Sequence, residues 1–213
     1  METKTNSGNI IYGTHCLSDY SMFPEQFKRA RDLVKYFDLH YQPVFVFFKR
    51  KVPDYKIKIF FREGCGAAVN DEKTEISYGI ANSLEDKGCL VHEVAHIVQN
   101  YPKKNKYNQD TPQWIIEGMA QYCRYRFGKD DLDWKIECPQ GECYETDIYY
   151  CAAAFIIWLE KKSPEKDFIP KLNDWIYNGE LIEDFLIDVF KQNVRSLWED
   201  YKHESPHEVI YPL

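Results

Sequence analysis

The stretch GCLVHEVAHIVQNY, residues 88–101, constrains the fold more than any other part of the 213-residue chain. Small and aliphatic residues surround His92, Glu93 and His96, so a helix built from this stretch is buried on nearly every side. Buried charged and titratable groups are costly unless they are paired, hydrogen-bonded or bound to metal. The chain must therefore fold around this helix and supply partners for its polar side chains.

The spacing of the two histidines predicts a zinc site. Side chains four positions apart lie on one face of a helix, so His92 and His96 can direct their ring nitrogens at a common atom. Glu93 lies about 100° further round the helix, close enough to reach a water on that metal without replacing it as a ligand. The alternative is a core helix whose histidines are satisfied by hydrogen bonds. Two features favour zinc: the burial of the helix, and a buried carboxylate on the next predicted helix that could be a third ligand.

A second copy of the pattern, HESPH at residues 203–207, fails on physical grounds. Pro206 has no backbone N–H to donate and pushes Ser205 away from helical angles. His203 and His207 are therefore not expected to share a helical face, and we predict no metal site there.

The third zinc ligand is predicted to be Glu117, in the segment WIIEGMAQY. Its neighbours are again apolar, and a buried carboxylate is costly unless it is paired or bound to metal. One metal ion would account both for the buried histidines of the first helix and for the buried Glu117 of the second. Gln121 follows Glu117 by four residues and occupies the same face, where it either supports a ligating histidine through a hydrogen bond or faces solvent. The sequence leaves both alternatives open.

The order of the elements predicts an α+β fold. Residues 24–41 have helical periodicity, and residues 44–49, 55–61 and 74–80 are predicted strands of one small mixed sheet. Further along, helices are predicted over residues 110–128, 148–162, 163–179 and 193–204, the third of them interrupted at Pro170. A sheet followed by a mainly helical half is typical of the α+β class.

The length of the chain favours one domain over residues 1–213, with a flexible start at 1–20 and a C-terminal tail at 203–213. We expect a monomer.

Composition excludes some partners and leaves the compartment open. The net charge of −7 gives no attraction to nucleic acid or to anionic membranes, and no stretch is long enough to span a bilayer. The first residues lack the basic and apolar regions of a secretory signal, and the chain has no Asn-x-Ser/Thr acceptor.

Seven cysteines are many for a cytosolic protein of this size and favour an oxidising compartment. Cys138 and Cys143 flank a turn that a disulfide could close. The alternative is a structural zinc site formed by these two residues with Cys123 and Cys151, which we consider weaker because the spacing of the first pair exceeds that of tight zinc pairs.

With His92, Glu93, His96 and Glu117 in place, the chain resembles the gluzincins, zinc peptidases with a glutamate as third ligand. More narrowly, it resembles the basic secretory protein family of plant and bacterial zinc peptidases over residues 56–201. The segments that carry the resemblance are TEISYGIANS, VHEVAHIVQNY, PQWIIEGMAQYCRYRFG, YYCAAAFIIWLE and VRSLWEDYK. The resemblance implies a zincin-like domain with the zinc helix under an edge strand, Zn²⁺ held by His92, His96 and Glu117, and secretion.

These expectations combine into a metallopeptidase acting on peptides or proteins. Glu93 would activate a zinc-bound water for attack on a peptide bond. Tyr149 and Tyr150 are the hydroxyl donors predicted to stabilise the oxyanion, against the alternative that they are packing or surface tyrosines. The strand at 75–80 would pair with an extended substrate at the sheet edge. Two alternative functions are a catalytically silent binding protein on the same scaffold and a non-proteolytic zinc amidase.

Overall fold

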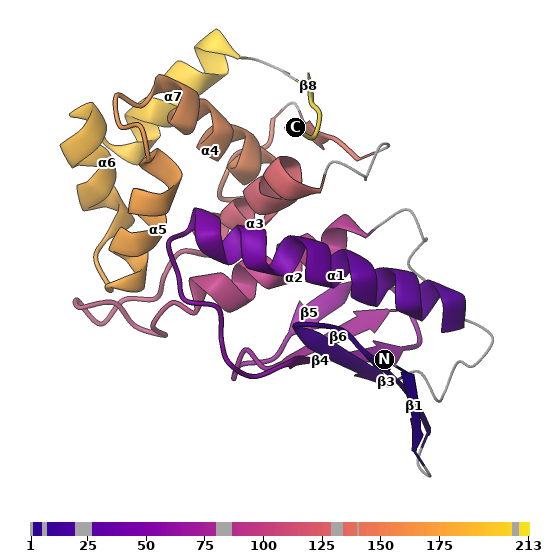
Figure 1. Cartoon of the computed structure of the whole chain (residues 1–213). Helices are drawn as coiled ribbons and strands as arrows, with labels where there is room; N and C mark the ends of the chain where they lie inside the picture. The colour runs from indigo at the N-terminus through magenta and orange to yellow at the C-terminus, as the bar shows by residue number, and fades with distance from the viewer. Residues whose placement is uncertain are drawn as a thin grey trace. The chain divides into compact units, whose positions relative to one another are not determined.

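The computed structural model describes residues 2–5, 8–19, 27–79, 87–128, 134–139, 141–205 and 209–213. The chain divides into two compact units. The first contains the residues up to Val98 together with Phe127–Trp134, and the second contains Gln99–Arg126 and Lys135–Leu213. A sheet dominates the first unit and helices dominate the second (Figure 1), which confirms the predicted α+β class. The single domain expected from chain length stays a prediction.

The first unit is built on a six-stranded mixed sheet in the order β1-β2-β3-β4-β6-β5. Strands β3, β4 and β6 run parallel, whereas the other neighbouring strands pair antiparallel. The strands are β1 Glu2–Thr5, β2 Gly8–Tyr12, β3 Cys16–Asp19, β4 Ile57–Arg62, β5 Ala67–Val69 and β6 Glu75–Gly79. The strands predicted over 55–61 and 74–80 are confirmed as β4 and β6. The sequence did not predict β1, β2, β3 or β5, because segments of three to five residues carry little strand periodicity.

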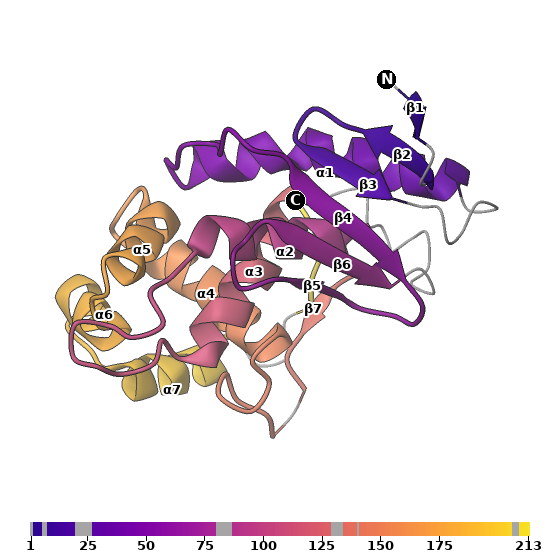
Figure 2. The ribbon, with the colours of Figure 1, turned by 90° about the horizontal axis from the view of Figure 1, so that it is seen from below.

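Two helices cover one face of this sheet. They are α1, Phe27–Phe47, and α2, Gly88–Gln99, and both lie above the strands in Figure 1 and behind them in Figure 2. Side chains of β4 alternate accordingly: Ile57 and Ile59 are buried, whereas Lys58 and Phe60 are exposed. The alternation is that of an open sheet with one packed and one solvated face.

The strand predicted over residues 44–49 is wrong, because α1 runs on to Phe47. Phe45 is buried four residues after the buried Tyr41, whereas the side chain of Val46 is 63% exposed. β-branched and aromatic residues favour strands, but the three- and four-residue spacing of the buried side chains continues the helical stripe. Packing against the sheet therefore decides the local structure.

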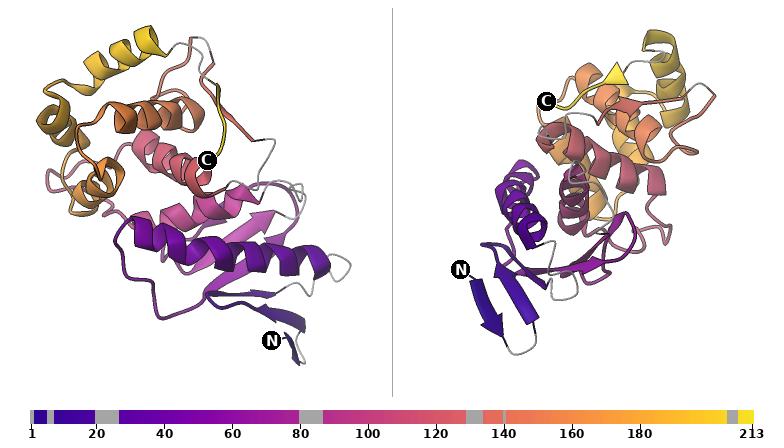
Figure 3. Two further views of the ribbon diagram at one scale, coloured as in Figure 1. Left: turned by 45° about the horizontal axis from the view of Figure 1, so that its top comes forward. Right: turned by 90° about the vertical axis from the view of Figure 1, so that its right-hand side faces the viewer.

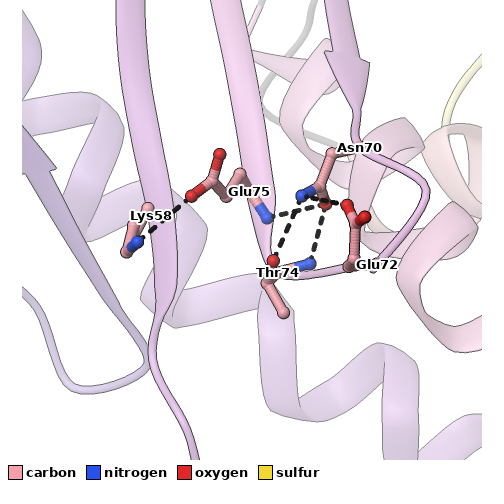
Figure 4. Close-up of polar contacts among 5 residues, drawn as sticks. All are labelled: Lys58, Asn70, Glu72, Thr74 and Glu75. Carbon is pink, nitrogen blue, oxygen red and sulfur yellow. Dashed lines mark hydrogen bonds and ion pairs between the residues drawn. The ribbon is translucent and has the colours of Figure 1, made fainter.

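The turn between β5 and β6 is held by Asn70 (Figure 4). Its side-chain oxygen accepts the backbone N–H groups of Thr74 and Glu75 at 2.9 and 3.0 Å, and its amide donates to Glu72 at 3.0 Å. On the other side of β6, Glu75 pairs with Lys58 of β4 at 3.1 Å. Strand β6 is therefore flanked on both sides, and the prediction that it offers a free edge is wrong. Among the described strands the outer position next to it belongs to β5.

The second unit is a group of helices with α4 at its centre. All residues of α4 from Cys151 to Leu159 are buried, which a helix needs when it is surrounded on every side. The elements are α3 Gln113–Phe127, α4 Tyr150–Lys162, α5 Phe168–Tyr177, α6 Ile182–Phe190 and α7 Val194–Glu204, with β7 Ile136–Glu137 paired to β8 Val209–Ile210. Figure 3 shows α4 to α7 from two further sides.

The helices predicted over 110–128, 148–162 and 193–204 are confirmed as α3, α4 and α7. The interruption predicted at Pro170 is wrong. Pro170 lies in the first turn of α5, where its missing N–H breaks no intrahelical hydrogen bond. His203 lies near the end of α7, and His207 lies outside the described residues.

The sequence left open whether Cys138 and Cys143 form a disulfide, and the structure shows that they do not. Cys138 is bonded to Cys151, and their Cα atoms are 4.4 Å apart. The turn that follows Cys138 brings the chain back to the first turn of α4, while Cys143 keeps a free thiol that accepts a hydrogen bond from Thr146. Because the disulfide uses two of the four thiols, the alternative of a four-cysteine zinc site is excluded.

Candidate metal centre

Helix α2 places two histidine nitrogens side by side. The Nε2 atoms of His92 and His96 are 3.0 Å apart, and the two rings are nearly perpendicular, at 85°. Ligand nitrogens 2.0–2.1 Å from a tetrahedral zinc lie about 3.3 Å apart. The pair is therefore close to the spacing that a metal requires, as the one-turn separation in the sequence predicted.

The carboxylate that completes the group comes from α3. Glu117 is half-buried, and its neighbour Ile116 accepts a hydrogen bond at 2.7 Å from the side chain of Gln99, the last residue of α2. One ligand atom each from His92, His96 and Glu117 lie within 4.8 Å of one another. Among the described residues, this is the one group of three His, Cys, Asp or Glu side chains whose ligand atoms lie close enough together to hold a metal ion.

Glu93 is buried in the same helix but does not belong to that group. Its side chain is 5% exposed, and Oε2 has no hydrogen-bond partner among the residues that the structure describes. A buried carboxylate oxygen without a partner costs free energy. A water beside a metal would give that oxygen a partner, so the side chain fits a site of this kind.

Residues 66–201, more than half of the chain, match the model of the BSP family, whose description is "Peptidase of plants and bacteria". The chain belongs to this family. The match confirms the resemblance inferred from the sequence and supports peptidase activity. It includes β5, β6, α2 and α3, and with them the histidine pair and Glu117. No curated protein matches the chain.

Gln121 is buried in this BSP family member. Its side chain is 6% exposed, and Oε1 has no hydrogen-bond partner within the described part of the chain. The surface-facing alternative is therefore wrong. Support of a ligating histidine stays a prediction, and it would explain why an amide oxygen is buried without a partner.

Tyr149 and Tyr150 lie at the start of α4 and expose 43% and 37% of their surface. Their backbone N–H groups donate to one oxygen of Asp147, at 3.1 and 2.8 Å, which fixes the first turn of the helix. The role of the two tyrosine hydroxyls as oxyanion donors stays a prediction.

Gln99 is the residue near this centre that sequence reasoning missed. It is 2% exposed, and its hydrogen bond to Ile116 ties the end of α2 to the turn of α3 that carries Glu117. A polar residue one turn after His96, at the end of an apolar helix, was the available signal.

None of the helices in the described ranges has the length and apolar character needed to cross a membrane.

Proposed function

We propose that this member of the BSP family is a zinc-dependent metallopeptidase. The observation that carries the proposal is the group of two histidine nitrogens and one carboxylate oxygen within 4.8 Å, beside a buried glutamate that stands outside the group. A purely structural metal site has no use for such a glutamate. The family description supplies the substrate class, because a peptidase acts on peptide bonds.

The donor set favours zinc. Imidazole nitrogens and a carboxylate oxygen are common zinc ligands, and three protein ligands are typical of catalytic rather than structural zinc sites. His92, His96 and Glu117 would hold the ion. When bound, zinc would polarise the peptide carbonyl and lower the pKa of a water ligand to about 7.

Glu93 would act as the general base and then as the general acid. Its unpartnered Oε2 would accept a proton as the water oxygen bonds to the carbonyl carbon. The same carboxyl group would return the proton to the nitrogen of the leaving amine as the carbon–nitrogen bond breaks. A hydroxyl from Tyr149 or Tyr150 would donate a hydrogen bond to the carbonyl oxygen while it carries negative charge.

The edge of β5 would bind the substrate backbone. An extended peptide can add to a sheet edge through main-chain hydrogen bonds. Because β6 is flanked by β4 and β5, β5 rather than β6 offers this edge within the described sheet. β5 spans only Ala67–Val69, which limits backbone pairing to a few residues of substrate.

Cleavage of a diverse peptide library tests the proposal, with the zinc-loaded parent compared with Glu93→Gln. Glutamine keeps the shape of the side chain but cannot accept the proton. We expect the parent to cleave peptides and the variant to lose at least about a hundredfold in rate, with equal zinc content in both. Cleavage by neither protein at full zinc occupancy would contradict peptidase activity. Equal rates would contradict the role of Glu93.

A further inference from the structure

The second unit contains a pocket that the proposed chemistry does not use. It lies where the chain enters α3 and has a volume of about 300 Å³. Its apolar wall includes Trp114, Tyr144 and Ile176, each less than 10% exposed. The indole ring of Trp114 meets the ring of Tyr144 edge to face, with their centroids 4.9 Å apart. A volume at the lower end of the range for ligand pockets suits one side chain or a small organic molecule.

The charged residues that line this pocket are all carboxylates. They are Asp110, Glu145, Glu180 and Glu183. Two of these carboxylates have a lysine partner, because Lys104 pairs with Asp110 and Lys106 pairs with Glu180. Glu183 accepts a hydrogen bond from a neutral donor, the backbone N–H of Val194, at 3.3 Å. The pocket therefore keeps an excess of negative charge above an aromatic wall.

We propose that this pocket binds an organic cation of the arginine side-chain type, a guanidinium or ammonium group on an apolar stem. Carboxylates at the rim would accept charge-assisted hydrogen bonds from the cation. The aromatic wall would pack against the stem and attract the positive charge through its ring faces. An anion would be repelled, and a neutral apolar ligand would desolvate the carboxylates without replacing their hydrogen bonds.

The raised pKa of Tyr144 agrees with a negatively charged pocket. Burial and then the nearby Glu145, Cys143 and Glu183 side chains raise the pKa of Tyr144 to about 12, and Arg195 acts in the opposite direction. The carboxylates thus act on the ring that forms part of the wall.

Binding of acetyl-arginine amide, followed by calorimetry and by the amide and indole NMR signals, tests this proposal. Acetyl-citrulline amide is the matched ligand, because it has nearly the same shape without the charge. We expect the arginine compound to bind about tenfold tighter or more and to shift the indole signal of Trp114. Glu145→Gln, at an exposed position, should weaken that binding about three- to tenfold. Glu199→Gln, an exposed carboxylate on α7 outside the pocket, should leave it unchanged.

Gln109→Lys provides a second variant that adds a positive charge to the lining, and it should weaken binding of the arginine compound further. The cation could be a free small molecule or an arginine side chain of a peptide. Agmatine, which carries the guanidinium group without a peptide backbone, distinguishes the two. Affinity equal to that of acetyl-arginine amide would support a site for the free cation, and weaker binding would support a side chain presented by a peptide. Equal binding of the arginine and citrulline compounds, absence of saturable binding, or wild-type affinity in both pocket variants would overturn the proposal. The outcome is independent of the proposed function, since binding is measured without turnover.

Discussion

At the scale of single residues, each of the two helices of the candidate metal centre buries a side-chain oxygen that has no hydrogen-bond partner among the described residues. These oxygens belong to Glu93 on α2 and Gln121 on α3, and both side chains are less than 10% exposed. Folded proteins satisfy most buried polar atoms, because an unsatisfied one costs about 1–3 kcal/mol. Two such atoms in the helices that carry His92, His96 and Glu117 are expected if a bound ion and its water complete the site.

Gln121→Met tests whether the buried amide supports the metal. Methionine has a similar volume without the amide oxygen, so we expect zinc affinity to fall about ten- to hundredfold, the usual effect of losing a hydrogen bond to a ligating side chain. Stability should stay the same or rise, because an unsatisfied polar atom is removed. Competition with a chelator measures affinity and urea unfolding measures stability. Unchanged zinc affinity would show that Gln121 has no part in the site.

Glu204 provides a pH-dependent link between α7 and α4. Hydrogen bonds from Lys162, at 2.5 Å, and from the indole N–H of Trp158, at 3.2 Å, lower the pKa of Glu204 below its ordinary value. A lowered pKa in the folded state stabilises the protein above the pKa of the unfolded chain, about 4.3. That stabilisation is lost as the pH falls through the folded-state pKa.

Glu204→Gln should therefore be less stable than the parent near neutral pH, by a small amount because the pair is exposed. The difference should shrink as the pH falls below about 4.3 and disappear once the pH is below the folded-state pKa of Glu204. Urea unfolding at several pH values measures it. A difference that persists or grows in acid would contradict the contribution of this ion pair.

At the scale of secondary-structure elements, α3 packs tightly against α4 at Gly118 of α3. A Cβ atom added there would lie 2.8 Å from the Cβ of Ala152 and 2.9 Å from Cδ1 of Ile156, both on α4. These distances are too short for carbon atoms in contact, so the helices would have to separate. Gly118 thus fixes the position of the turn of α3 that carries Glu117 against the central helix.

Gly118→Ala should destabilise the protein by about 1–3 kcal/mol through overpacking, although alanine favours an exposed helix by about 1 kcal/mol over glycine. Urea unfolding measures the change. Gln113→Ala, at an exposed position of the same helix, is the matched control and should change stability by less than about 0.5 kcal/mol. A more stable Gly118→Ala protein would contradict the close packing of α3 on α4.

The disulfide between Cys138 and Cys151 joins the segment after β7 to the start of α4. Its cysteines are separated by 13 positions, and closing a loop of this size stabilises a fold by about 3 kcal/mol. We expect Cys138→Ala to lose about 2–4 kcal/mol and Cys143→Ala to lose less than about 0.5 kcal/mol. Urea unfolding under non-reducing conditions compares them. Equal losses in the two variants would contradict the observed pairing, and peptide mapping identifies the bonded cysteines directly.

Elements with sustained periodicity could be predicted from the sequence, and those whose structure depends on distant contacts could not. Helices α3, α4 and α7 followed from their apolar spacing and end signals. Residues 44–49 have the composition of a strand, but packing of Phe45 with Tyr41 on one face makes them part of α1. Cys138 is nearer in sequence to Cys143 than to Cys151, yet the path of the intervening turn decides the partner.

At the scale of the whole molecule, the candidate site was more predictable than the sheet around it. His92, Glu93 and His96 follow from a local helical repeat, and Glu117 was found because its apolar surroundings demand a partner. The family match begins at residue 66, so β1 to β4 and α1 lie outside it. The acidic pocket was not predictable, because its lining joins segments between Asn105 and Val194 that share no sequence pattern.

The activity proposed for the chain requires that peptide cleavage depends on one metal ion. Cleavage of the peptide library by the parent protein before zinc removal, after it and after zinc is restored tests this most directly. We expect cleavage to cease when a chelator removes the ion and to return with one equivalent of zinc in the parent but not in His96→Ala. Full cleavage by protein stripped of metal, or equal recovery in His96→Ala, would contradict a metallopeptidase built on His92, His96 and Glu117.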